Sequence, residues 1–210
     1  MLSNKTVLVL APHTDDGELG CGGAIAKLID QGSKVFYVAF STAEASVPAG
    51  FPRNQLAVEV KFATEKLGIP PDQLFVYKYQ VRKLNYMRQE ILEELIRLRP
   101  FVQPDIVFLP SSRDIHQDHM TIHKEGIRAF KRSTILGYEL IWNNLSFSTD
   151  CFIEINRSQL DRKIEALKAY KTQEGKAYMD AKFIESMAIV RGKQIEVPYA
   201  EAFEAIRLIF

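Results

Sequence analysis

Short apolar runs alternate with segments of helical periodicity in the first part of the chain. Residues 6–10 and 35–40 are continuous apolar runs, which are typical of strands covered on both faces. Between them, residues 22–31 repeat apolar positions at helical spacing, and Gly32 follows as a helix stop. A strand, a helix and a second strand in this order predict a βαβ unit and therefore a parallel sheet.

The same alternation continues along the rest of the chain. Helices are predicted for residues 55–67, 85–98, 118–131, 158–170 and 177–191, and further strands for residues 74–77, 105–109, 135–142 and 152–155. We expect Pro100 to end the helix at 85–98, and Ser158 to cap the helix that begins there. Residues 201–210 fit either a strand or a helix.

Residues 41–55 interrupt this pattern with a segment that contains Ser, Ala, Gly and two Pro. Loops of this length in a compact domain are usually lids or binding loops. No repeat, low-complexity tract or linker divides the chain, so we expect a single domain over residues 1–210.

The composition excludes several classes of protein. Of 210 residues, 47% are hydrophobic and 25% are charged, which is the balance of a globular protein and not of a disordered one. The 27 Lys and Arg nearly equal the 26 Asp and Glu, so a net charge of +1 provides no general attraction to nucleic acid or anionic lipid. No run approaches the roughly 20 apolar residues of a membrane helix. We expect a cytoplasmic protein with neither a nucleic-acid nor a membrane partner.

The histidines are concentrated in two segments. His13 follows the first predicted strand and precedes two adjacent aspartates, and the other three lie between residues 116 and 123. Both segments follow a buried strand and open a helix. Because ligands of parallel sheets bind beyond the carboxyl ends of the strands, we expect the two segments to meet at one edge.

Two histidines and one carboxylate, with an open position for water, form a common catalytic zinc site. Adjacent aspartates on an extended loop point apart, so we expect one to bind the metal and the other to lie beside it. The free carboxylate can take a proton from a water that the metal has acidified. A spare histidine can stabilise the developing oxyanion. This argument leaves open which of Asp15 and Asp16 has which role.

Each residue taken alone has a simpler interpretation. His13 could be a satisfied polar residue, Asp15 and Asp16 could cap a helix, and His116 and His119 could lie on a solvated helix face with His123. Only their joint occurrence at two strand-to-helix junctions favours a metal site. For His123, we favour the surface or a supporting position over a ligand.

The glycine-rich segment at 20–23 could cradle a phosphate, but it does not match a dinucleotide fingerprint or a P-loop. We therefore favour close backbone packing beside the metal loop. Cys21 is expected to be a small buried residue and not a nucleophile. With Cys151 far away in sequence, the chain shows no disulfide framework.

These segments resemble two signatures of one family. Residues 12–23, PHTDDGELGCGG, resemble the first signature of the LmbE-like, or PIG-L, family of metal-dependent deacetylases. Residues 116–119, HQDH, resemble the second. Weaker similarities occur at Glu59, 67–68, 104–105, Lys163 and 199–203. The resemblance therefore covers most of the chain.

The resemblance implies a Rossmann-like, three-layer α/β fold with a mostly parallel sheet. It also implies a zinc-dependent amide hydrolase whose partner is a small N-acylated amino sugar of the N-acetylglucosamine type. By position, His13, Asp16 and His119 correspond to the metal ligands. Asp15 corresponds to the general base, and His116 to the residue that stabilises the tetrahedral intermediate. A homo-oligomer is a further expectation.

The chain departs from the family pattern in several places. Thr14 and Gln117 replace the usual prolines, and Gly17 stands where many members have Glu. In the predicted loop at 41–55, Arg53 could hold a substrate anion or be a surface residue. Arg113 and Asp114 are candidates for substrate contact, with helix or turn capping an equal alternative for Asp114.

Other functions remain open at this stage. A metal-dependent phosphoesterase would favour two metals and a basic cluster, which four histidines and few clustered Lys or Arg near the motifs support less well. A non-catalytic nucleotide-binding module would use the same sheet without zinc. A family member that retains the metal site without turnover is a third alternative. The ligand set would also accept iron, cobalt or manganese.

Overall fold

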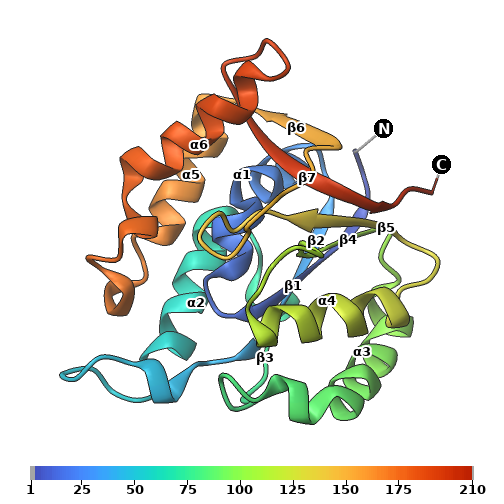
Figure 1. The fold of residues 1–210 in the computed structure, drawn as a ribbon, viewed down its shortest axis with the longest axis vertical. Helices are drawn as coiled ribbons and strands as arrows, with labels where there is room; N and C mark the ends of the chain where they lie inside the picture. Colours follow the sequence, from blue (N-terminus) through green and yellow to red (C-terminus); the bar gives the residue numbers. More distant parts are fainter. Residues whose placement is uncertain (1–2, 210) are drawn as a thin grey trace.

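The computed structural model describes residues 3–209, which form a seven-stranded sheet with helices on both faces (Figure 1). The strands are β1 (Thr6–His13), β2 (Lys34–Ser41), β3 (Leu74–Val76), β4 (Ile106–Pro110), β5 (Thr134–Tyr138), β6 (Cys151–Ile155) and β7 (Tyr199–Arg207). The helices are α1 (Asp16–Asp30), α2 (Gln55–Leu67), α3 (Arg88–Val102), α4 (Gln117–Ala129), α5 (Arg157–Leu167) and α6 (Ala181–Lys193). None of the described helices is long and apolar enough to cross a membrane.

The sheet has the strand order β3-β2-β1-β4-β5-β7-β6. The first five strands pair in parallel, whereas β7 runs antiparallel to both β5 and β6. This arrangement confirms the prediction of an α/β fold with a mostly parallel sheet. Strands β2 and β3 lie on one side of β1 in the sheet. The chain then crosses over, and β4 and β5 lie on the other side of β1. The carboxyl ends of β1 and β4 therefore flank a topological switch point, where open α/β sheets bind ligands.

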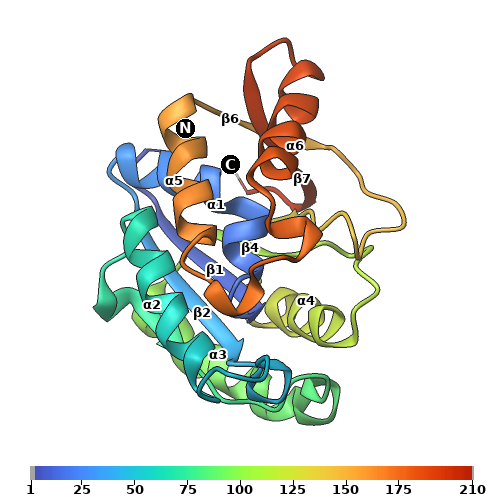
Figure 2. The ribbon, with the colours of Figure 1, turned by 90° about the vertical axis from the view of Figure 1, so that its left-hand side faces the viewer.

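Two apolar cores cover the two faces of the sheet. Figure 2 shows α1, α2 and α5 together on one side, and the core beneath them also includes residues of α6. The second core lies under α3 and α4. Successive residues of β1 point to opposite faces, so that Val7 and Val9 enter the first core and Leu8 and Leu10 the second. This alternation explains why β1 is apolar at every position.

The first helix begins at Asp16, six positions before the predicted start at Gly22. Its backbone breaks at Cys21, where φ is −146° and ψ is 22°, so α1 consists of two short helical halves. The apolar periodicity of the sequence revealed only the second half. Asp16 and Glu18 are buried in the first turn, where polar residues signalled a loop.

A buried ion pair stabilises this break. The carboxylate of Glu201 on β7 accepts the N–H groups of Gly23 and Ala24, at 3.0 and 2.7 Å, and so caps the second half of α1. The Nζ atom of Lys163 on α5 lies 2.6 Å from the same carboxylate and donates to the carbonyl oxygen of Leu19 at 2.7 Å, at the end of the first half. The backbone groups released by the break are thereby satisfied.

The glycines at 20–23 permit this close packing. A Cβ atom at Gly22 would lie 2.9 Å from the side chain of Lys163, and one at Gly23 would lie 2.6 Å from Ile155. These contacts support the interpretation of the segment as close backbone packing. Cys21 is fully buried, as expected, and its Sγ atom donates to a backbone oxygen at 3.2 Å.

Several predicted element ends were wrong. The helix expected to end at Pro100 continues to Val102, because proline in the last turn removes only one hydrogen bond. Asn156, and not Ser158, caps α5, since its side chain forms a capping box with Gln159. The last predicted helix starts only at Ala181, after a 3₁₀ turn, and the ambiguous tail is strand β7.

The buried ion pair gives a first prediction. Lys163→Met should lower the free energy of unfolding by about 3–5 kcal/mol, because it leaves the Glu201 carboxylate buried without a cation. Urea unfolding followed by circular dichroism measures this change. Lys168→Met is the matched control, since Lys168 pairs with Glu165 at 2.7 Å where both side chains are more than half exposed. It should change stability by less than about 1 kcal/mol, and equal effects of the two substitutions would contradict the assignment.

Candidate active site

A pocket of about 290 Å³ lies beyond the carboxyl ends of β1 and β4. It brings together all five residues that the sequence analysis assigned to the site, from the β1–α1 junction and from the start of α4. Its lining residues are His13, Thr14, Asp15, Asp16, Leu19, Ala43, Ser46, Leu56, Val81, Arg82, His116, His119, Trp142, Asn143, Gln173, Lys176 and Tyr178. The expectation that the two motif segments meet at one edge of the sheet is thus confirmed.

Three donor atoms face one another at the centre of this pocket. The Nδ1 atom of His13 lies 3.1 Å from Oδ2 of Asp16 and 3.3 Å from Nε2 of His119. The same Asp16 oxygen lies 3.3 Å from Nε2 of His119. A zinc ion bound tetrahedrally at about 2.0–2.1 Å requires donors roughly 3.3 Å apart. The three atoms therefore fit the geometry of a single zinc ion.

Two buried carboxylates orient the imidazoles of this set. The Nε2 atom of His13 lies 3.0 Å from Oδ2 of Asp118, and the Nδ1 atom of His119 lies 2.7 Å from Oδ2 of Asp114. Each ring donates its N–H to a carboxylate and thereby turns the lone pair of its other nitrogen toward the centre. Carboxylate–histidine–metal arrangements of this kind fix the tautomer of a ligand and make it more basic.

His116 is held differently. Its Nδ1 atom accepts the backbone N–H of Asp118 at 3.2 Å, as the cap of α4. A neutral ring in this position carries its proton on Nε2 and is a donor. Burial, together with the neighbouring His119 and His13, lowers the pKa of His116, so the neutral form predominates at pH 7. Ring nitrogens of all three histidines nevertheless lie within 4.8 Å of one another, so by distance alone a His13–His116–His119 triad could also hold a metal.

The charges of the site call for a cation at its centre. Burial disfavours the charged imidazole of His13, yet Asp16 and Asp118 outweigh this effect and raise its pKa to about 9. Asp16 and Asp114 likewise overcome burial and raise the pKa of His119 to about 10. Without a metal, protons supply the positive charge. A divalent cation among the three donors would replace them.

Asp15 lies in the same pocket as the three donor atoms but is not one of them. It is half-buried at the start of α1 and lines the pocket. Burial and the nearby negative charge of Asp16 raise the pKa of Asp15 to about 6. The adjacent Asp16 differs, because His119 and His13 overcome burial and hold its pKa well below the usual range.

A buried hydrogen-bond network holds the loop between these residues. The hydroxyl groups of Tyr37 and Tyr170 lie 2.9 and 2.6 Å from the carbonyl oxygen of Thr14, and both also contact the carboxyl group of Glu18. Burial raises the pKa of Glu18 to about 8, so it is protonated at pH 7. The loop around Thr14 is thus fixed by side chains from β2 and from the segment that follows α5.

Other candidates lie outside the pocket. The Nδ1 atom of His123 contacts the carbonyl oxygen of Pro110 at 2.8 Å, which agrees with the expected supporting position. Arg53 borders an adjoining groove, and Arg113 lines neither this groove nor the pocket. Asp114 holds His119 and also accepts the backbone N–H of His116 at 2.9 Å, so its role is in the site and not only in a turn.

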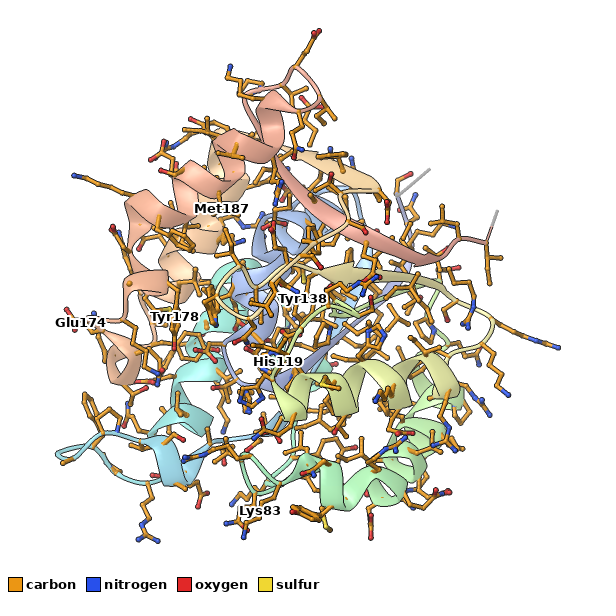
Figure 3. All side chains as sticks on the ribbon, in the orientation of Figure 1. Lys83, His119, Tyr138, Glu174, Tyr178 and Met187 are labelled. Carbon is orange, nitrogen blue, oxygen red and sulfur yellow. The ribbon has the colours of Figure 1, made fainter. Side chains whose placement is uncertain are left out.

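Sequence analysis missed several residues that line the pocket or support those that do. Asp118 lies inside the second motif, and its position between two histidines was the available signal. Arg82 and Lys176 come from irregular segments that carry no motif. Trp142 and Tyr178 also line the pocket, and their rings stack at 4.3 Å although 36 positions separate them in sequence. Figure 3 shows Tyr178 and His119 in the central part of the molecule.

Comparison with known proteins agrees with this geometry. The family described as PIG-L, GlcNAc-PI de-N-acetylase, matches residues 8–130, which include both motif segments. The chain therefore belongs to the PIG-L family of deacetylases.

Individual relatives are distant. An uncharacterized deacetylase of Escherichia coli, YaiS, is 26% identical over 80% of this chain and 91% of its own length. The diacetylchitobiose deacetylase of Thermococcus kodakarensis is 25% identical over 98% of this chain and 85% of its own length. Among solved structures, the conserved protein TT1542 of Thermus thermophilus superposes with a TM-score of 0.82 at 25% identity, covering 98% of this chain and 96% of that one.

The raised pKa values of His13 and His119 predict that metal binding at these rings releases protons. At pH 7, zinc binding should displace about two protons per ion, and affinity should rise with pH up to about 10, above which both rings are already neutral. Titration calorimetry in buffers of different ionisation enthalpy measures the proton count. Zinc uptake without proton release would show that the two imidazoles are not the ligands.

The carboxylates behind the histidines give a further prediction. Asp114→Asn should weaken zinc binding by about 10–100-fold, because the neutral amide no longer supports His119 electrostatically. Competition with a chelating dye measures the affinity. Asp105→Asn is the control. Asp105 lies just before β4, at the amino end of the strand and away from the pocket, and its Oδ2 atom accepts the N–H of Thr6 at 2.8 Å. An equal loss in both variants would indicate a general loss of stability.

Proposed function

We propose that this protein is a zinc-dependent hydrolase that removes an N-acetyl or related acyl group from a small amino-sugar derivative. The observation that carries the proposal is the set of three donor atoms at zinc spacing beside the free carboxylate of Asp15. The description of the matching family and the diacetylchitobiose deacetylase among the relatives support the sugar substrate. The cavity of about 290 Å³ suits a small molecule of this kind.

In this proposal His13, Asp16 and His119 hold the zinc ion. Asp16 is preferred to His116 as the third ligand, because the hydrogen bond to Nδ1 leaves His116 with a proton on Nε2 and no lone pair there. When bound, zinc supplies a Lewis acid that polarises the amide carbonyl and acidifies a water molecule.

Asp15 acts as the general base. Its carboxylate accepts a proton from the attacking water as the C–O bond forms, and its pKa of about 6 leaves it ionised but still basic near neutral pH. The same proton is then delivered to the amine nitrogen as the C–N bond breaks. One water is consumed, and a carboxylic acid and an amine are produced, which at neutral pH exist as carboxylate and ammonium.

His116 stabilises the negative charge that develops on the carbonyl oxygen. The backbone N–H of Asp118 fixes its ring, so its Nε2–H is oriented before the reaction starts. A fixed donor of this kind contributes about 2.7–4 kcal/mol when it is aimed at a developing oxyanion. In this proposal His13 and His119, whose rings contact carboxylates, bind the metal. His116, whose ring accepts a backbone N–H, donates a hydrogen bond to the substrate.

The proposal predicts that Asp15→Asn separates metal binding from catalysis. The variant should retain about one zinc ion per chain and lose about 10²–10⁴-fold in kcat, because the amide cannot accept the proton. Elemental analysis measures the metal, and amine release from a panel of N-acetylglucosamine derivatives measures turnover. His13→Ala should lose both the metal and the activity.

Glu174→Gln provides the control, because Glu174 is exposed and lies at the edge of the molecule in Figure 3. It should retain zinc content and turnover. Wild-type protein that takes up no zinc under metal-replete conditions would refute the proposal. Zinc uptake with full activity in Asp15→Asn would refute the role of Asp15.

A further inference from the structure

Two cations border the pocket without a carboxylate partner. Arg82 and Lys176 both line the pocket and are exposed. Among residues 3–209, no carboxylate forms an ion pair with either side chain. Their hydrogen-bond partners are neutral: Arg82 Nη2 donates to Ser46 Oγ at 3.3 Å, and Lys176 Nζ donates to the side-chain oxygen of Gln173.

The position of Arg82 is tied to the metal site. Its backbone is left-handed, with φ of 66°, which non-glycine residues rarely adopt. Its N–H donates to Oδ2 of Asp118 at 2.6 Å, and the N–H of Leu84 donates to the other oxygen at 3.1 Å. The same carboxylate orients His13. One buried group therefore fixes both a metal ligand and the backbone from which the guanidinium extends.

Lys176 is placed by a different part of the chain. It precedes the 3₁₀ turn Ala177–Met179, and its ammonium lies 5.6 Å from the ring centroid of Tyr178, whose ring also lines the pocket. Gln173 is buried and accepts from the ammonium. Two segments about 90 positions apart in sequence thus bring one positive charge each to the same pocket.

The carboxylates of the site are engaged at the metal centre. With zinc bound and the imidazoles neutral, the two charges of zinc and those of Arg82 and Lys176 match the four carboxylates of Asp15, Asp16, Asp114 and Asp118. Asp16, Asp114 and Asp118 contact the imidazoles, whereas the side chains of Arg82 and Lys176 hydrogen-bond to neutral groups and remain open to an anion. An adjoining groove, which shares Val81 with the pocket, carries two more cations, Arg53 and Lys78, against one carboxylate, Glu44.

We infer that the substrate carries a carboxylate or phosphate group, which Arg82 and Lys176 bind while the N-acyl group lies at the metal centre. This inference rests on the proposed function and narrows its substrate to anionic amino-sugar derivatives. The guanidinium of arginine matches both oxyanions with two parallel hydrogen bonds, and lysine adds a point charge. The anion and the amide belong to one small molecule, because the residues that would bind each group line the same pocket.

Three related compounds test the inference on the zinc-loaded protein. Methyl N-acetylglucosaminide is neutral, N-acetylglucosamine 1-phosphate carries a phosphate, and N-acetylmuramic acid carries a carboxylate. At low salt, at least one anionic compound should show a Kd and a KM about 10-fold or more below those of the neutral compound, and added salt should reduce the difference. Which anion is preferred distinguishes phosphate from carboxylate.

Variants identify the groups responsible. In Arg82→Met and in Lys176→Met, the preference for the anionic compound should fall to within about 2–3-fold, through KM more than through kcat. Lys83→Met is the matched control, because Lys83 adjoins Arg82 in sequence, is exposed and points away from the site in Figure 3. It should retain the full preference.

The possible outcomes distinguish a failure of this inference from a failure of the proposed deacetylase function. If wild-type protein binds and cleaves the neutral compound as well as both anions, the inference is overturned and the deacetylase function stands. If a preference exists but survives in both pocket variants, Arg82 and Lys176 are the wrong residues. If no amine is released but anions bind tightly and the variants lose that binding, the proposed function fails and the anion site stands.

Discussion

The mutual approach of three donor atoms within 3.3 Å is the constraint on which the rest of the site depends. Two imidazole lone pairs and a carboxylate oxygen at this spacing repel one another unless protons or a cation lie among them. Asp118 and Asp114 hold the rings of His13 and His119 in place from behind. The donors are therefore already arranged for a metal, so that binding one would cost little conformational freedom.

The three histidines differ in their hydrogen-bond partners and not in residue type. His13 and His119 each contact a carboxylate, which suits them to present a lone pair to a metal, whereas His116 accepts a backbone N–H, which suits it to donate a proton. Asp118 connects several of these functions, because its carboxylate contacts His13 and the backbone of Arg82. A polar network of this density is stable in a buried site only when its members are satisfied.

Most of the fold could be predicted from local pattern. Continuous apolar runs identified the strands, and helical spacing identified most helices, because burial of a strand or of one helix face imposes a period on the sequence. Element ends were less accurate. Asn156 displaced Ser158 as the cap of α5, and the first half of α1 went undetected because its buried residues are polar. Their partners, such as Glu201, lie far away in sequence.

The sequence by itself determined which histidines and aspartates are available as donors and that they follow two strands. These residues come together because parallel strands expose their carboxyl ends at one edge of the sheet. Only the tertiary structure decided which atoms face one another and what each is bonded to. The distance between two imidazole nitrogens depends on strand pairing, ring tautomer and supporting carboxylates, none of which leaves a periodic signal. The same holds for Arg82 and Lys176, which the fold brings to one pocket from irregular segments that no local pattern connects.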